Sequence, residues 1–79
     1  MHGYSYAFIK RIHTLAKNKT APVGVQLGAI AVQHEIPISK IAERVGVSRM
    51  TVYDWFTGKY EPKQSNLAKL KAYIERASA

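Results

Sequence analysis

Two short amphipathic segments joined by a tight turn constrain the fold of this 79-residue chain more than any other feature. In residues 38–45, Ile41 and Val45 share one side, as in a helix with one apolar face. Gly46 can adopt a positive φ at no steric cost, and Ser48 supplies a hydroxyl that caps the helix after it. The sequence therefore predicts two short helices that cross steeply over a turn of about three residues.

The second segment, residues 49–56, places Val52, Trp55 and Phe56 at the spacing of an inward helix face. Ala42 in the first segment is small enough for the point where the two backbones approach most closely. With those residues inside, the outward positions are Arg49, Met50, Tyr53, Asp54 and Thr57. Such a face is what a recognition helix presents to the major groove of DNA.

Helical periodicity continues outside these two segments. It predicts three further helices, over residues 5–17, 22–35 and 66–76. Thr20 is expected to cap the second of these, with Pro22 in its first turn, where a missing N–H has no energetic consequence.

The inward faces of these helices follow from the same periodicity. They are expected to comprise Val23, Leu27, Ile30, Ala31 and His34 in the helix over 22–35, and Leu67, Leu70 and Ile74 in the last helix. Gly24 and Gly28 allow another helix to approach closely and favour packing within the chain. The predicted fold is all-α, a compact bundle of four to five short helices that contains a helix-turn-helix.

An excess of positive charge indicates a polyanionic partner. Twelve Lys and Arg oppose five Asp and Glu, giving a net charge of +7, and nucleic acid is the commonest such partner. A domain this small leaves little room for a substrate pocket and carries no catalytic signature, which favours a binding module over an enzyme. The chain has no cysteine, and His2, His13 and His34 are too far apart for a short metal motif, so we expect neither metal nor cofactor.

Neither a membrane span nor a secretory signal is predicted. The most apolar stretch, residues 21–32, falls short of the roughly 18 residues that a membrane span needs. The first residues lack the basic start and apolar run of a signal peptide. We therefore expect a cytoplasmic protein.

The stretch from Ile38 to Lys59, followed by Pro62, resembles the helix-turn-helix of the phage Cro/CI repressor family, also called the Xre family. The resemblance covers about residues 20–74. The residues that carry it best are Ala42, Gly46, Trp55, Phe56, Thr57, Gly58 and Lys59. It implies a bundle of four or five helices, operator binding and, usually, a two-fold dimer. Residues 20–79 are then the DNA-binding domain, and residues 1–19 form an N-terminal extension, expected to be helical, whose role the resemblance does not supply.

The outward side chains of the second motif helix are the predicted base-reading residues. Arg49 opens this helix, where a guanidinium matches the O6 and N7 atoms of a guanine. Met50 is expected either to contact a thymine methyl group or to be half-buried against the neighbouring helix. Tyr53 is expected to contact DNA or to form a partly buried rim. Asp54 is expected to accept from a cytosine amino group, to orient a nearby Arg or Lys, or to lie just off the interface, with the last two favoured together.

Hydroxyl and basic side chains around that helix are the predicted phosphate contacts. Ser48 and Thr51 can bond phosphates or bases, with capping the main role expected of Ser48. In the resembling family the residues after the helix hold phosphates, which here are Thr57, Lys59, Tyr60 and Lys63. The family often has Gln where Ile38 stands, so backbone anchoring from the first motif helix falls to Ser39 and Lys40.

The expected partner is double-stranded DNA, with a homodimer reading a palindromic operator one half per subunit. The dimer contact would use Leu70, Tyr73 and Ile74, or alternatively Tyr4, Tyr6 and Phe8 of the N-terminal segment. The expected function is transcriptional regulation, as a repressor of phage or mobile-element type. The alternatives are an antitoxin that binds a partner protein through the N-terminal segment, the DNA-recognition part of a terminase or transposase, and a protein-binding adaptor that retains the fold.

Overall fold

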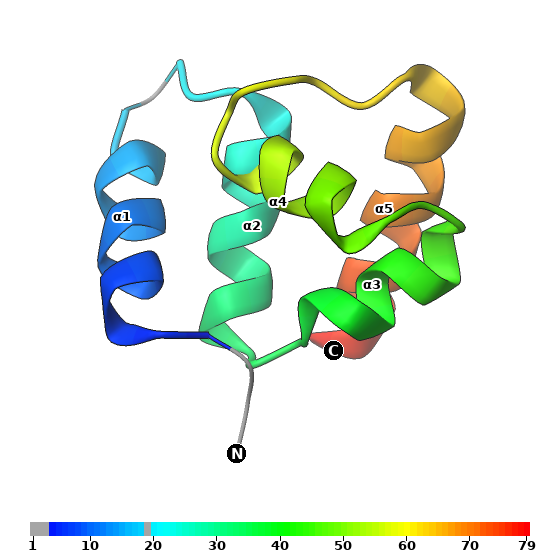
Figure 1. Cartoon of the computed structure of the whole chain (residues 1–79), viewed down its shortest axis with the longest axis horizontal. Helices are drawn as coiled ribbons and strands as arrows, with labels where there is room; N and C mark the ends of the chain where they lie inside the picture. Colours follow the sequence, from blue (N-terminus) through cyan, green and yellow to red (C-terminus); the bar gives the residue numbers. More distant parts are fainter. Residues whose placement is uncertain (1–3, 19) are drawn as a thin grey trace.

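Five helices make up the computed structural model, which describes residues 4–18 and 20–79. They are α1 (Tyr6–Ala16), α2 (Val23–Gln33), α3 (Ile38–Val45), α4 (Arg49–Phe56) and α5 (Gln64–Ala77). Within the described residues there is no strand, and the helices form a compact bundle (Figure 1). The predicted all-α fold is confirmed, with every helix boundary within two residues of its expected position.

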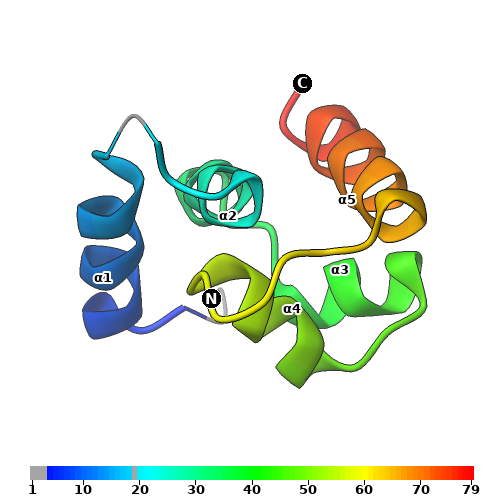
Figure 2. The same cartoon turned by 90° about the horizontal axis from the view of Figure 1, so that it is seen from above.

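Helix α2 is the centre of the bundle. It packs against α1, α4 and α5, while α3 packs against α4 and α5 (Figures 1 and 2). Ala31 is fully buried and Leu27 nearly so, as expected, but Ile30 and His34 are exposed. The expected inward face of α2 was therefore wrong at these two positions. The buried positions of α2 are Gly24, Val25, Leu27, Gly28, Ala31 and Val32.

Gly24 and Gly28 let α2 and α4 approach at backbone distance. A Cβ atom at Gly24 would lie 2.6 Å from the carbonyl oxygen of Trp55, and one at Gly28 would lie 2.8 Å from Cγ of Phe56. Both separations are too short for a real methyl group, so the crossing requires two glycines. The expectation that this pair serves internal packing is confirmed.

Helix α1 is joined to the bundle at its start and along its length. Ser5 caps it by accepting a hydrogen bond from the Phe8 amide, and Ile12 is fully buried. The Tyr4 hydroxyl donates to the Ile36 carbonyl at 2.6 Å, and burial raises the pKa of this hydroxyl. Tyr4 is therefore a core residue, and its expected place among the exposed aromatics was wrong.

Two further expectations are corrected. Thr20 does not cap α2, because its hydroxyl donates to Oδ1 of Asn18 at 2.8 Å and α2 begins after Pro22 without a side-chain cap. Leu70 and Ile74 are fully buried within the bundle. Neither is available for the dimer contact that was one of the two alternatives.

No helix within residues 4–18 and 20–79 is long and apolar enough to cross a membrane.

Replacing Gly24 with alanine tests the α2–α4 crossing. We expect Gly24→Ala to lower the free energy of unfolding by about 1–3 kcal/mol, because the added methyl group forces the Trp55 backbone away. Urea denaturation followed by circular dichroism measures this change. Gln33→Ala, on an exposed position of the same helix, is the control. A stabilisation by Gly24→Ala, as intrinsic helix propensity alone would give, contradicts the close approach.

Candidate nucleic-acid interface

The turn between α3 and α4 has the geometry that its sequence predicts. Gly46 has φ 86° and ψ 35°, the left-handed conformation that glycine tolerates. The amides of Gly46 and Val47 both donate to the Ala42 carbonyl, at 2.8 and 3.0 Å, which closes the end of α3. The Ser48 hydroxyl then accepts from the Thr51 amide at 3.1 Å and begins α4. The two helices are therefore held at a defined crossing by backbone bonds and one cap.

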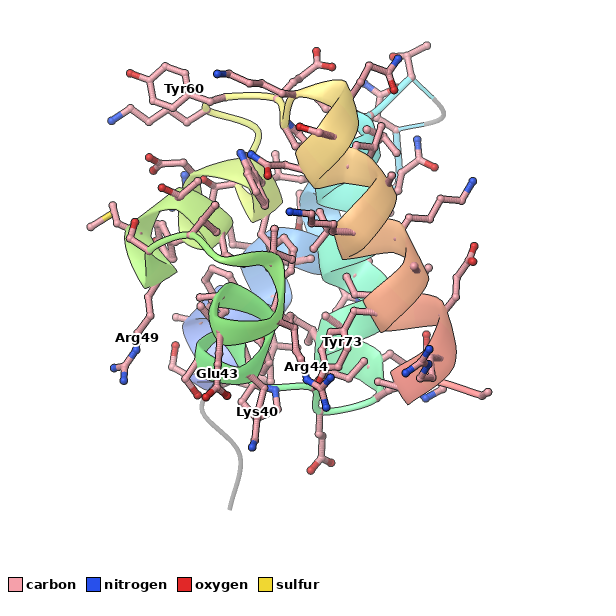
Figure 3. All side chains as sticks on the ribbon, turned by 90° about the vertical axis from the view of Figure 1, so that its right-hand side faces the viewer. Lys40, Glu43, Arg44, Arg49, Tyr60 and Tyr73 are labelled. Atoms are coloured by element: carbon pink, nitrogen blue, oxygen red, sulfur yellow. The ribbon has the colours of Figure 1, made fainter. Side chains whose placement is uncertain are left out.

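Helix α4 divides into a buried face and an open face. Val52 and Phe56 are fully buried and Trp55 is 4% exposed, as predicted. On the other side Arg49 is exposed and projects away from the bundle (Figure 3). Two helices joined this way, the second anchored on one face and free on the other, form a helix-turn-helix.

Comparison with protein-family models matches residues 28–75 to the family described as "Helix-turn-helix", which is more than half of the chain. The chain belongs to this family. It is the Cro/CI type, or Xre family, so the resemblance seen in the sequence is confirmed. The family indicates a DNA-binding regulator that acts on double-stranded DNA. Comparisons with curated proteins and with solved structures gave no match.

In this helix-turn-helix, α4 occupies the position of the recognition helix. Met50 is 66% exposed, which excludes the alternative of half-burial against a neighbouring helix and leaves its side chain open to a ligand. Tyr53 is 37% exposed and lies at a rim, in contact with α1. Together with Arg49 these side chains form the outward arc of α4.

Several polar groups of α4 hold the helix itself. The Ser48 and Thr51 hydroxyls lie 2.9 Å apart, and the Thr57 hydroxyl donates to the Tyr53 carbonyl at 2.9 Å. Asp54 is half-buried, and no ion pair joins its carboxylate to any of the arginines and lysines that the structure describes. Asp54 therefore orients no described Arg or Lys, while a cytosine contact and a position just off the interface stay predictions.

Basic side chains lie at both ends of the arc. Beyond α4, Lys59 places Nζ 5.6 Å from the centroid of the Tyr60 ring, and Lys63 precedes α5 in an exposed position. Ser39 and Lys40 are exposed in the first turn of α3. Figure 3 shows Arg49 and Tyr60 at opposite ends of α4, with Lys40 beyond α3. The predicted phosphate contacts Ser39, Lys40, Lys59, Tyr60 and Lys63 are thus all exposed.

An aromatic contact from α1 supports the open face of α4. The Phe8 ring lies 5.2 Å from the Tyr53 ring at 31°, and on its other side it stacks with Tyr4 at 5.5 Å. Ile38 lines the hollow between them, so the residue that replaces the family's Gln faces α1. Sequence reasoning did not connect Phe8 with α4. No local signal joins Phe8 to α4, because the contact depends on how α1 packs against the bundle.

Removing the Phe8 ring tests whether α1 orients Tyr53. We expect Phe8→Ala to relax base preference at the operator position nearest Tyr53, because that ring then loses its partner, while Phe8→Tyr preserves the preference. Selection of bound sequences from random duplexes measures it. His34→Ala is the control, since it removes an exposed ring beyond the end of α2, away from α1 and α4. An unchanged preference in Phe8→Ala, in a variant that still melts cooperatively, contradicts the orienting role.

Proposed function

We propose that this chain is a sequence-specific transcriptional regulator that acts by occupying an operator, with α4 in the major groove and no catalytic step. The observation that carries the proposal is the division of α4. Val52 and Phe56 fix the helix in the core, while Arg49 and Met50 extend outward. A helix anchored in this way meets base edges without a change of fold.

Arg49 is the proposed main reader of sequence. It stands in the first turn of α4, the part of a recognition helix that contacts base edges. Its guanidinium can donate two parallel hydrogen bonds to one guanine, which discriminates against other bases by roughly 1–3 kcal/mol. Met50 offers an apolar contact for a thymine methyl group next to it.

Phosphate contacts are proposed to supply most of the affinity. Ser39 and Lys40 approach the backbone from α3, and Thr57, Lys59, Tyr60 and Lys63 approach it from the loop after α4. Each neutralised phosphate releases counterions, so binding weakens as salt rises. The net charge of +7 supports such a contribution.

We further propose that two copies read a palindromic operator in the cytoplasm and repress transcription, in the manner of phage or mobile-element regulators. One recognition helix covers only a few base pairs, and a second copy doubles the sequence that is read. With Leu70 and Ile74 buried, α1 is the proposed dimer contact. Its Tyr6 is 79% exposed, which supports this choice.

Selection of bound sequences from random duplex DNA at physiological salt tests the proposed function. We expect the wild-type chain to enrich a palindromic consensus and Arg49→Ala to lose the preference at one position in each half. Lys71→Ala, an exposed cation on α5, should keep the wild-type consensus. If the wild-type chain enriches nothing, operator binding is wrong.

Lys59 tests the electrostatic part of the mechanism. We expect Lys59→Ala to weaken binding to all duplexes alike and to reduce the slope of log K against log salt by about one. Fluorescence anisotropy over a salt series measures both effects. Lys71→Ala, on the exposed surface of α5, should change neither. An altered consensus in Lys59→Ala would assign this residue to base reading instead.

A further inference from the structure

A basic groove lies between α3 and α5, away from the recognition helix. It encloses about 220 Å³ and is lined by Arg44, Lys69, Ala72, Tyr73 and Arg76. Three of these five side chains are cationic, and none is acidic. Glu43 and Glu75, the nearest acids along each helix, do not line it. The groove is therefore a concave surface of one charge.

Arg44 is held in place by the ring of Tyr73. Its guanidinium carbon lies 5.6 Å from the ring centroid, and the two residues come from different helices (Figure 3). Stacking on an aromatic face orients a guanidinium and leaves its N–H donors in the ring plane free. Among the described residues, Lys69 and Arg76 form no hydrogen bond or ion pair through their side chains. Tyr73 thus orients the Arg44 guanidinium, and the side-chain N–H donors of Lys69 and Arg76 bond to no other described residue.

The groove and the outward arc of α4 lie on different sides of α3. Helix α3 packs against both α4 and α5. Arg49 and Tyr60 point to one side of the bundle, whereas Arg44 and Tyr73 lie between α3 and α5. The outward arc of α4 and the groove therefore open on different sides of the bundle, with Lys40, one turn before Arg44 on α3, at the margin of the groove (Figure 3).

A second copy of the chain is a poor occupant. In a two-fold contact the same surface meets itself, so Arg44, Lys69 and Arg76 would face their own equivalents. Juxtaposed like charges oppose association. Charge complementarity requires an occupant rich in carboxylates.

We propose that the groove between α3 and α5 docks an acidic segment of a partner protein while α4 holds DNA. Lys69 and Arg76 are two helical turns apart, a rise of about 10 Å along α5. Carboxylates seven residues apart on a helix, or three apart on an extended segment, match that separation. Arg44 and Tyr73 lie in the same groove, where the guanidinium accepts a carboxylate bidentately and the ring packs on side-chain methylenes. Docking in the groove does not depend on operator binding, whereas its coexistence with bound DNA rests on the proposed function.

Anisotropy of a fluorescein-labelled octaglutamate peptide tests the groove directly. We expect Lys69→Glu/Arg76→Glu to weaken peptide binding by about tenfold or more at roughly 150 mM salt. Lys10→Glu/Lys17→Glu makes the same change in net charge on exposed α1 positions and should stay within about threefold of wild type. Thermal melts of both variants confirm that each remains folded.

Two outcomes overturn the proposal. Equal losses in both double variants would mean that net charge, and not the groove, binds the peptide. In the second outcome, duplex DNA that lacks any operator displaces the peptide from the wild-type chain and binds less tightly to Lys69→Glu/Arg76→Glu. The groove would then be a contact for the DNA backbone. Chemical-shift changes in the NMR spectrum that centre on Tyr73, and not on Tyr53, support docking in the groove.

Discussion

The close approach of α2 and α4 is the contact on which the rest of the structure depends. Two glycines of α2 face the Trp55 backbone and the Phe56 ring at distances that no side chain would allow. This contact draws one side of α4, with Val52, Trp55 and Phe56, into the core. A recognition helix must have such an inner anchor, because its other face has to stay free for the duplex.

Around that anchor, different parts of the bundle perform different tasks. Helix α3 and the Gly46 turn set the crossing angle, and α1 places Phe8 against the rim of α4 at Tyr53. Basic groups are distributed on more than one surface. Lys40 and Lys59 flank the outward arc, whereas Arg44 and Arg76 line a separate groove. A chain of this size can therefore hold DNA on one face and present a second positively charged face to another partner.

Local signals predicted most of the fold and the core of the motif. These signals act within a few residues of one another. The predicted turn at Gly46, the Ser48 cap and the buried positions of Val52, Trp55 and Phe56 were all confirmed. Expectations failed where burial depends on distant segments. Ile30 and His34 fit a helical period but face solvent. Leu70 and Ile74 are buried as their inward spacing predicted, which removes them from the dimer contact that was one alternative. One local expectation also failed, because the Thr20 hydroxyl bonds to Asn18, two residues before it, and does not cap α2.

The sequence by itself determined the helices, the turn, the positive charge and the outward position of Arg49, because these follow from helical period, backbone preference and composition. Only the tertiary structure decided which residues of different helices contact one another. The Phe8 contact with Tyr53 and the groove of Arg44 with Tyr73 each join helices well separated along the chain. Such contacts have no periodic signature, since they arise from how the helices pack, and the glycine crossing of α2 on α4 sets that packing.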